Sequence, residues 1–289
     1  TTSDLEPYNQ KIWKFDPSFM DTQMVERIPK PPKIYIINSA RGKKTEGYKH
    51  QLFFHYPKKN GIQALFDAYY NQLNERKTKV LLNEKILSVS NNDKTTIIKT
   101  SKKIYKCDRL ISTIPLNELC NITKKIPSTV FEKSKHLKYN SIIIALVNVR
   151  GKVAGNNFAF MVPQKDIIFH RLSKLDLKEK NYSKKNSTTF LIEITFKQTD
   201  MISKLTNLEI RSKIYEGLKK LKFCKTKRDI NFSEIKKFKY AYVIYDLNHR
   251  KNVDYILKYF KSVNINNAGR LGSWEYLNSD QVIFQSKEL

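Results

Sequence analysis

The sequence predicts an α+β protein, and two observations support this class. Its 289 residues are 40% hydrophobic and 12% aromatic, enough apolar material for a buried core, and the length corresponds to about two domains. The middle of the chain (140–196) consists mostly of strand-like runs, whereas helical spacing of apolar residues occurs before and after it. Strands grouped between mixed segments are typical of the α+β class.

The first part of the chain predicts little regular structure before one clear helix. Residues 5–35 carry five prolines spaced with aromatic residues, so we expect an irregular segment, with at most short helices, that wraps another surface. A short strand is expected at 52–57. A helix follows, with Asn60 as its expected N-cap, because apolar residues then recur at helical spacing: Ile62, Leu65, Phe66, Tyr69, Tyr70 and Leu73.

The rest of the chain alternates between strands and a few helices. Residues 79–90 are expected to pair with 95–100 across a turn, and 104–115 to form a short strand and then an apolar one that ends at Pro115. A solvated loop is expected at 178–187. Further strands are expected at 140–151, 157–163, 166–172, 188–196, 239–247 and near 263–266, and helices at 200–221, at 250–260 and from about Ser279.

The chain is strongly basic, with 54 basic and 27 acidic residues and a net charge of +27. Two interpretations are open. A nucleic-acid-binding module would use the cations to neutralise phosphates. However, 44 of the basic residues are lysine and they are scattered through every predicted element, while Asn and Ile are abundant and Ala and Gly scarce. This pattern favours a compositional bias that placed lysine on solvated faces, and we therefore expect no nucleic-acid partner.

Several motifs of catalysis and targeting are missing from the sequence. No apolar run approaches the ~18–20 residues of a membrane span, and Cys107, Cys120 and Cys224 are too few for a disulfide framework, so we expect a soluble, cytoplasmic protein. There is no HExxH, paired CxxC or GxSxG motif, and we expect no metal site. Eight glycines provide neither GxGxxG nor a phosphate-binding loop.

Four segments, in order, resemble a flavoprotein superfamily. They are PYNQKIW (7–13), YPKKNGIQAL (56–65), the region from NEKILSVSNND to CDRLISTIP (83–115) and AGRLGSWEYLNSDQVI (268–283). Together they are similar to the FAD-dependent amine oxidases, protoporphyrinogen oxidases and UDP-galactopyranose mutases. One departure is Asn60-Gly61 where a double glycine is usual. Asn is the residue other than glycine that best tolerates positive φ, so the turn can be kept.

The resemblance implies an α/β FAD-binding domain remainder and a mostly antiparallel substrate domain with helices. The expected division is a substrate-domain segment with a proline-rich wrap (1–60), an FAD-domain part (61–120), the substrate domain (121–248) and the C-terminal part of the FAD domain (249–289). The superfamily's N-terminal Rossmann portion, which carries GxGxxG, has no counterpart here. Because the chain opens with Thr1, we expect a fragment, or a chain completed by a partner chain.

The resemblance also implies FAD as the cofactor and a set of residues that contact it. Gly269 would allow close backbone approach, Arg270 offers a forked cation for a phosphate, and Asp280 could accept from a ribityl hydroxyl. The N–H groups of Gln281 and Val282 would face the flavin. Three further contacts are expected earlier in the chain, at Gly61, Ile86 and Thr113. An ordinary capped C-terminal helix and a plain core strand are the structural alternatives for the last helix and for Ile86.

Five residues are candidates for the substrate pocket: Tyr8, Trp13, Arg171, Tyr242 and Tyr245. Aromatic rings with a polar tip suit a flat or glycosidic ligand, and Arg171 suits an anionic one. Partly buried packing is the alternative for each of the tyrosines. No catalytic acid or base can be named from the sequence.

Three functions follow from these observations. The first is the C-terminal portion of an FAD-dependent oxidoreductase that transfers electrons or hydride from an unidentified small-molecule substrate to the flavin. The second is a mutase-like isomerase of a nucleotide sugar, in which the flavin acts in its reduced state. The third is the basic nucleic-acid-binding module described above.

Overall fold

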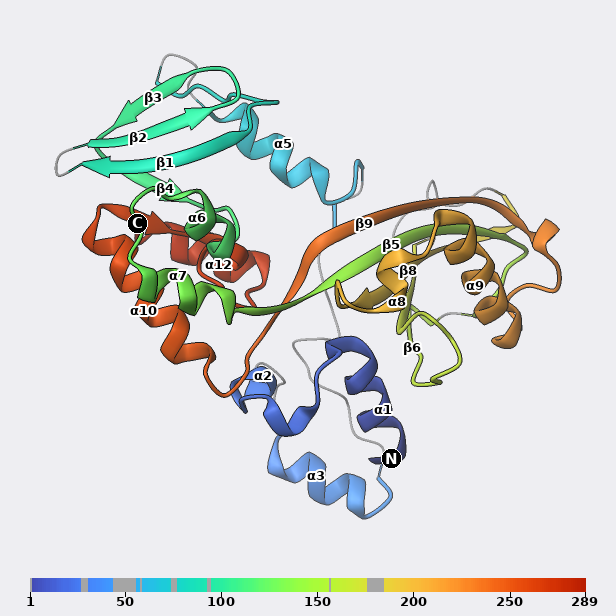
Figure 1. Cartoon of the computed structure of the whole chain (residues 1–289). Helices are drawn as coiled ribbons and strands as arrows, with labels where there is room; N and C mark the ends of the chain where they lie inside the picture. The colour runs from blue at the N-terminus through green and yellow to red at the C-terminus, as the bar shows by residue number, and fades with distance from the viewer. Residues whose placement is uncertain are drawn as a thin grey trace.

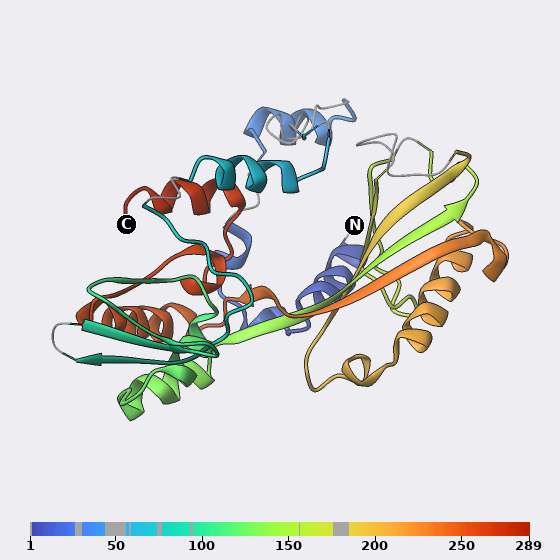
Figure 2. The ribbon, with the colours of Figure 1, turned by 90° about the horizontal axis from the view of Figure 1, so that it is seen from above.

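A computed structural model of the chain describes residues 2–26, 31–43, 56–57, 59–73, 77–92, 95–155, 157–175 and 185–289. The described residues form two lobes joined by two long paired strands, β5 (Lys138–Arg150) and β9 (Ile230–Ile244), as Figures 1 and 2 show. Antiparallel sheets and helices are both present in quantity. The predicted α+β class is confirmed.

The first lobe is a five-stranded antiparallel sheet in the order β6-β7-β8-β5-β9. Its remaining strands are β6 (Ala159–Met161), β7 (Arg171–Lys174) and β8 (Ser187–Phe196), and α8 (Met201–Lys204) and α9 (Asn207–Lys220) accompany it. Alternate residues of β8, such as Phe190 and Ile192, pack with Ile210 and Ile214 of α9. The other face of β8 is polar, and it bears Glu193 and Thr195.

The second lobe combines two small sheets with a group of helices. One sheet is antiparallel and consists of β1 (Ile86–Asn92), β2 (Thr95–Thr100) and β3 (Ile104–Cys107). The other is a parallel pair of β4 (Leu110–Ser112) and β10 (Ile265–Asn267). The helices are α6 (Leu116–Ile122), α7 (Ser128–Lys135), α10 (His249–Ser262), α11 (Gly269–Gly272) and α12 (Ser279–Ser286).

The two lobes have separate hydrophobic cores. Leu119, Val130, Ile256 and Trp274 belong to the core of the second lobe, which also takes residues 242–245 at the end of β9. The predicted boundary at residue 120 divides α6, and α7 packs in the same core as α10. The change from one core to the other therefore falls within β5 and β9. The four-part domain division as a whole stays a prediction.

The N-terminal segment is more helical than its prolines predict. It forms α1 (Thr2–Trp13), a 3-10 helix at Pro17–Phe19, α2 (Gln23–Glu26) and α3 (Lys33–Ala40). The expectation of only short helices over 5–35 is wrong for α1, which contains Pro7. Tertiary contacts compensate for the backbone hydrogen bond that proline cannot make. The end of α1 is fastened to the sheet, because Asn140 Nδ2 donates to the Ile12 carbonyl at 2.8 Å and Thr195 Oγ1 to the Lys11 carbonyl at 2.8 Å.

Asn140→Ala is expected to lower the free energy of unfolding by about 2 kcal/mol, since it leaves buried backbone groups unpaired. The Asn140 side chain is fully buried; it donates to the carbonyls of Ile12 and Trp13 and accepts from the Tyr242 N–H. Urea unfolding followed by circular dichroism measures the change. The exposed Asn207→Ala is the control and should change stability by less than about 0.5 kcal/mol. Equal effects of the two substitutions would show that the Asn140 contacts are not structural.

Some element boundaries differ from the sequence prediction. The first strand begins at Ile86 rather than at residue 79, and the strand predicted at 166–172 begins only at Arg171, because Ile167 and Phe169 enter the core from a loop. The helix predicted over 200–221 is divided because Thr206 caps α9 through its hydroxyl. Most of the strand predicted at 52–57 and of the loop at 178–187 lies outside the described residues.

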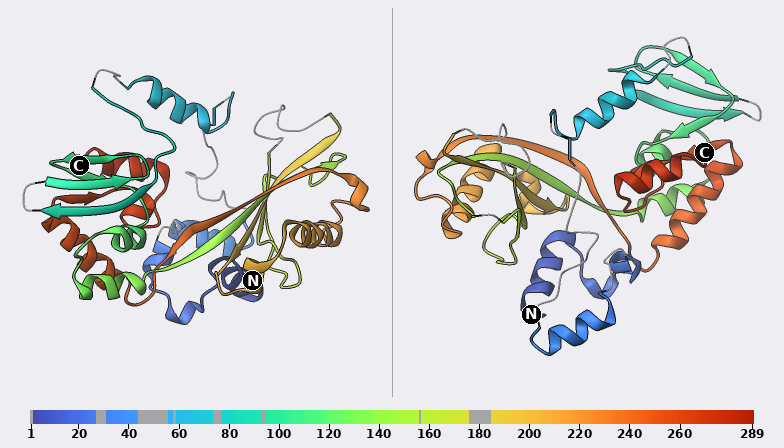
Figure 3. Two further views of the ribbon diagram at one scale, coloured as in Figure 1. Left: turned by 45° about the horizontal axis from the view of Figure 1, so that its top comes forward. Right: turned by 180° about the vertical axis from the view of Figure 1, so that it is seen from behind.

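Helix α5 (Gln63–Asn71) confirms the predicted helix but not its predicted cap. The residue before its first turn is Ile62, and Asn60 and Gly61 take φ of +60° and +57°. Asn60 thus occupies the left-handed region that the usual glycine would occupy. The apolar side chains of α5 are exposed; Phe66, for example, is 56% exposed. Figure 3 shows the helix at the periphery of the second lobe.

Candidate cofactor and substrate site

The ends of β4 and β10 bring two distant parts of the chain together. The strands run parallel with Asn267 opposite Ser112, and the Ala268 N–H donates to the Ser112 carbonyl at 2.9 Å. Thr113 follows one strand and Gly269 follows the other. Ligands of α/β proteins bind at the carboxyl ends of parallel strands. Two of the residues predicted to contact a cofactor therefore share the edge where such contact is expected.

Gly272 permits a close contact between these segments. A Cβ atom at this position would lie 2.8 Å from the Ser112 carbonyl oxygen and 3.2 Å from the Thr113 Cα. Only glycine allows α11 to lie this close to the backbone of the turn after β4. Gly269 has a φ of +75°, in the region that favours glycine. Both glycines of the Gly-Arg-Leu-Gly segment are therefore needed for the local geometry.

Arg270 extends from this junction toward Tyr276 and toward Tyr242 at the end of β9. Its guanidinium carbon lies 4.1 Å from the ring centroid of Tyr276 and 5.5 Å from that of Tyr242. Its Nε and Nη2 atoms are buried and have no hydrogen-bond partner within the described residues. Buried guanidinium donors without acceptors are rare in proteins and indicate that a ligand can supply the acceptor.

The residues around Arg270 form a group that we call the arginine–tyrosine cluster: Tyr8, Trp13, Arg171, Glu193, Tyr242, Arg270 and Tyr276. Three of its rings pack edge to face, with centroid distances of 5.5 Å (Trp13–Tyr242), 5.8 Å (Trp13–Tyr276) and 5.4 Å (Tyr242–Tyr276). Such pairs fix ring orientation and add about 0.5–1.5 kcal/mol each. Four of the five residues predicted to bind substrate are thus in one place.

Glu193 organises the cluster and was not predicted from the sequence. Glu193 is 4% exposed, and its carboxylate accepts from Arg171 Nε at 2.7 Å and from the Tyr242 hydroxyl at 3.2 Å. Burial raises the pKa of Tyr242, and the Glu193 charge adds to this. For Arg171, burial lowers the pKa, but the Glu193 charge, its hydrogen bond and the neighbouring tyrosines together outweigh burial, so the net pKa is raised. The available signal was one acidic residue inside the apolar run Thr188–Phe196.

Comparison with known proteins identifies the family. The family model described as flavin containing amine oxidoreductase matches residues 34–238. The chain belongs to this family. Protoporphyrinogen oxidase of Dictyostelium discoideum is 28% identical over 119 residues, which cover 38% of this chain and 22% of that protein.

Two solved structures have a similar fold. Reduced UDP-galactopyranose mutase matches with a TM-score of 0.81 and 18% identity, covering 94% of this chain and 59% of that one. A putative protoporphyrinogen oxidase from Exiguobacterium sp. 255-15 matches with a TM-score of 0.64 and 14% identity, covering 79% and 51%. This family member therefore spans 22% of its curated relative and little more than half of these solved structures. The predicted superfamily is confirmed.

His170 lies under the cluster of this amine oxidoreductase family member. The ring is fully buried, its centroid is 6.2 Å from that of Tyr8, and neither ring nitrogen has a hydrogen-bond partner within the described residues. Burial lowers the pKa of His170 to about 3, and the charges of Arg171, Lys11 and Lys14 add to this. The ring is therefore neutral at pH 7, and its 3.8 Å approach to Glu193 Oε2 is no ion pair.

Acidification is expected to destabilise the protein before its carboxylates titrate. The unfolded chain protonates histidine near its ordinary pKa of 6.5, whereas burial lowers the pKa of His170 to about 3 and that of His249 to about 4. At acidic pH the unfolded state therefore binds more protons than the folded state. As the pH is lowered from 7 to 5, the free energy of unfolding decreases by about 2 kcal/mol per histidine. Urea midpoints at both pH values measure this. His170→Gln should remove about half of the difference; an unchanged difference would contradict the assignment.

Tyr245, the fifth predicted substrate residue, contacts the backbone of Tyr276 and does not belong to the cluster. Its hydroxyl donates to Glu275 Oε2 at 2.5 Å and accepts from the Tyr276 N–H at 2.8 Å, and Arg250 binds the other Glu275 oxygen at 2.6 Å. A cavity of about 350 Å³ is lined by Tyr245 and Gln281 among others. A predicted substrate residue and a predicted cofactor residue therefore meet here.

The remaining predicted cofactor residues are not members of the cluster, although Gln281 lines the same cavity as Tyr276, and Val282 Cγ1 lies 3.9 Å from the position that a Cβ at Gly269 would take. Asp280 is exposed at the start of α12. The Gln281 N–H donates to the Asn278 side chain and the Val282 N–H to the Asn278 carbonyl, so neither amide is unpaired. Gly61 precedes α5, and Ile86 begins β1 opposite Thr100. Contacts of these five residues with a cofactor stay predictions.

Neither a metal site nor a membrane-spanning helix is found in the part of the chain that the structure describes. No group of three or more His, Cys, Asp or Glu side chains is arranged to hold a metal ion. Over the same residues, the helices are all too short or too polar to cross a bilayer.

Proposed function

We propose that the chain supplies the substrate-facing part of an FAD-dependent oxidoreductase and part of its cofactor site. In this reaction electrons or hydride pass from a small-molecule substrate to the flavin. The observation that carries the proposal is Arg270, whose buried and unpaired donors lie at the carboxyl ends of β4 and β10 in a flavoprotein-family chain.

The residues at this junction suit FAD. Gly272 lets α11 pack directly against the turn at Thr113, Gly269 adopts a positive φ, and Arg270 offers a forked cation to an anionic or carbonyl oxygen. When bound, FAD supplies the electron- or hydride-accepting ring that no side chain offers. The protein's own contribution is orientation: Glu193 fixes Arg171 and Tyr242, and Trp13 and Tyr276 fix the faces of the rings.

We further propose that a Rossmann segment outside these 289 residues, or a partner chain, completes the cofactor domain. Parallel sheets are normally buried on both faces and extend over several strands, whereas β4 and β10 form a pair in which Ile111 is 48% exposed. Exposed apolar residues of α5 form a second uncovered surface. The similar structures are also considerably longer than this chain.

The cluster favours an anionic substrate with a flat or glycosidic part. Arg171 and Arg270 provide two cations against the single carboxylate of Glu193, and the tyrosines provide rings with polar tips. A mutase-like isomerase of a nucleotide sugar is the second candidate, because the fold match to UDP-galactopyranose mutase covers more of the chain and has the higher TM-score. A nucleic-acid-binding module is less well supported in a chain of a flavoprotein family.

Flavin binding tests the proposal with the chain purified together with its Rossmann segment or partner chain. This complex is expected to show the visible absorbance of bound flavin. Arg270→Ala should weaken the binding of FAD about tenfold or more, since hydrogen bonds to charged groups contribute about 1.5–3 kcal/mol. Arg228→Ala, an exposed arginine of the other lobe, is the control.

Two outcomes would contradict the cofactor assignment, and two more separate the candidate reactions. Absence of flavin from the complex, or full FAD affinity of Arg270→Ala, would contradict the cofactor assignment. Net substrate oxidation supports the oxidoreductase. Turnover that needs prior reduction of the flavin and gives no net oxidation supports the isomerase.

A further inference from the structure

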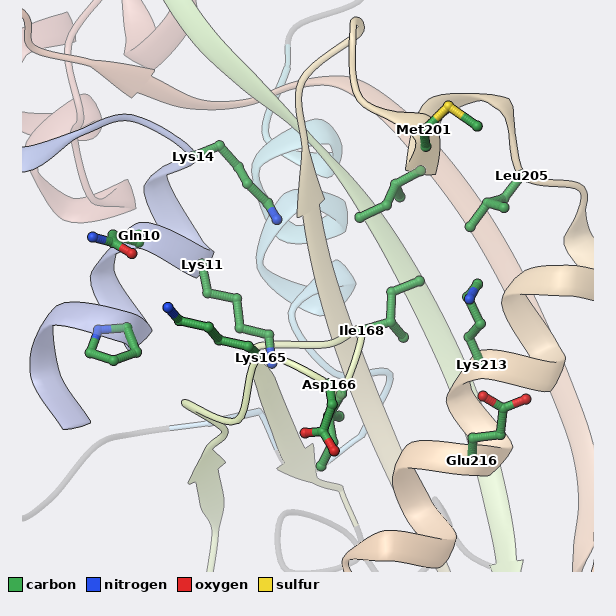
Figure 4. A pocket seen from close by; sticks show the side chains of 13 residues that line it. Gln10, Lys11, Lys14, Lys165, Asp166, Ile168, Met201, Leu205, Lys213 and Glu216 are labelled. Carbon is green, nitrogen blue, oxygen red and sulfur yellow. The ribbon is translucent and has the colours of Figure 1, made fainter. Parts of the chain in front are cut away.

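A second possible binding site lies on the opposite side of α1 from its aromatic contacts. It is a groove of about 570 Å³ between the end of α1, the 165–168 loop, α8 and α9 (Figure 4). This volume is within the range of small-molecule sites. Its lining combines two kinds of side chain, apolar ones from the loop and α8, and lysines from α1, the loop and α9: Ile167, Ile168, Met201, Ile202, Leu205, and Lys11, Lys14, Lys165, Lys213.

The floor of the groove is apolar. Ile167 is buried in the core of the first lobe, and Ile202 and Leu205 pack against the same core. Ile168 points into the centre of the groove, and Met201 lies at the rim above it (Figure 4). These side chains offer an apolar ligand a continuous surface that is already fixed by packing.

The rim of the groove carries an excess of positive charge. Four lysines and two carboxylates line it, and Asp166 is already bound to Lys220 at 2.7 Å. The other carboxylate, Glu216, accepts from the Ser212 hydroxyl at 3.4 Å. The field in the groove is therefore positive and attracts anions.

Lys11 and Lys14 are the two lysines of the groove whose pKa values are lowered by burial. Lys11 Nζ donates to the carbonyls of Val162 (3.0 Å) and Gln164 (2.8 Å), and the Lys14 side chain makes no hydrogen bond or ion pair within the described residues. Burial and the neighbouring Lys14 lower the pKa of Lys11 to about 8, against the effect of Asp166. Burial also lowers the pKa of Lys14. An anion placed between them would relieve their repulsion and complete their hydrogen bonding.

We propose that this groove binds a small amphipathic carboxylate, with the head group at Lys11 and Lys14 and the apolar tail on Ile168 and Leu205. The combination of a cationic rim and an apolar floor is what selects this class. An inorganic anion would leave the floor exposed, and an uncharged apolar molecule would leave the lysines unpaired. The site is separate from the arginine–tyrosine cluster, although α1 contributes to both.

Calorimetric titration of the purified chain with decanoate tests the proposal. Saturable binding at one site is expected, with binding of acetate and of 1-decanol at least tenfold weaker. Lys14→Gln should weaken the binding of decanoate about tenfold, because one charge-assisted contact is lost. Ile168→Asp should weaken it further, because it places a carboxylate on the floor.

Two variants on one helix provide a matched comparison. Lys213→Gln removes a rim cation, whereas Lys219→Gln removes an exposed lysine of α9 that does not line the groove. Only Lys213→Gln should weaken the binding of decanoate. The proposal is overturned if decanoate does not bind, if 1-decanol binds equally well, or if folded Lys14→Gln and Ile168→Asp variants retain the affinity of the original chain.

Discussion

Glu193→Ala is expected to lower the free energy of unfolding by about 3 kcal/mol, because it leaves a partly buried cation without its partner. Arg171 would lose its 2.7 Å bond and the Tyr242 hydroxyl its 3.2 Å acceptor. Fully buried pairs cost about 3–5 kcal/mol to break. The Arg171 side chain is 35% exposed and can turn partly into water, so the lower end of that range applies.

Chemical unfolding of a small series of variants measures this effect. Glu193→Gln keeps the size of the side chain and one acceptor oxygen, and should lower the free energy of unfolding clearly less than Glu193→Ala does. The control is Glu234→Ala, because the ion pair of Glu234 with Lys236 is solvent-exposed and is worth about 0–1 kcal/mol. In the Arg171→Leu background, Glu193→Leu should cost less than it does alone. If Glu193→Ala is as mild as Glu234→Ala, Glu193 does not organise the cluster.

Gly272→Ala is expected to lower the free energy of unfolding by about 1–3 kcal/mol and to displace the segment that carries Arg270. The added Cβ would lie 2.8 Å from the Ser112 carbonyl oxygen, and that oxygen also accepts from the Ala268 N–H. The clash is with backbone, which cannot turn aside as the end of a flexible side chain can. The contact between the turn after β4 and α11 must therefore open.

Tryptophan fluorescence reports this displacement directly. The chain has two tryptophans, Trp13 in the arginine–tyrosine cluster and the fully buried Trp274, which lies two residues after Gly272. The emission of folded Gly272→Ala should shift to longer wavelength as Trp274 meets water. Ser273→Ala, which adds no atom beside the β4 turn, is the control. A native emission spectrum and unchanged stability for Gly272→Ala would refute the close-contact role of this glycine.

Much of the fold could be predicted from local patterns in the sequence. The long β-branched run at 140–151 predicted β5, and helical spacing at 250–260 predicted α10, because both elements bury a face whose period is visible in the sequence. The exposed apolar face of α5 was equally visible as a pattern, but its exposure was not, because a pattern does not say which surface covers it.

The candidate site was only partly accessible. The resemblance predicted a role for Gly269 and Arg270, and aromatic chemistry one for Tyr242 and Trp13. The sequence did not reveal that Arg270 faces Tyr242 and Tyr276, since this contact joins the C-terminal tail to β9. Glu193 was missed because a single acidic residue in a strand has no partner until the sheet places Arg171 beside it.

The sequence alone thus determined the α+β class, most of the strands and helices, and the flavoprotein superfamily, because periodicity and short motifs are local properties. Only the tertiary structure decided that α1 forms a helix despite Pro7, that four predicted substrate residues come together in the arginine–tyrosine cluster, and that β4 and β10 bring Thr113 and Gly269 to the same edge. These features depend on contacts between residues far apart in the chain, whose geometry follows from packing and not from neighbouring residues.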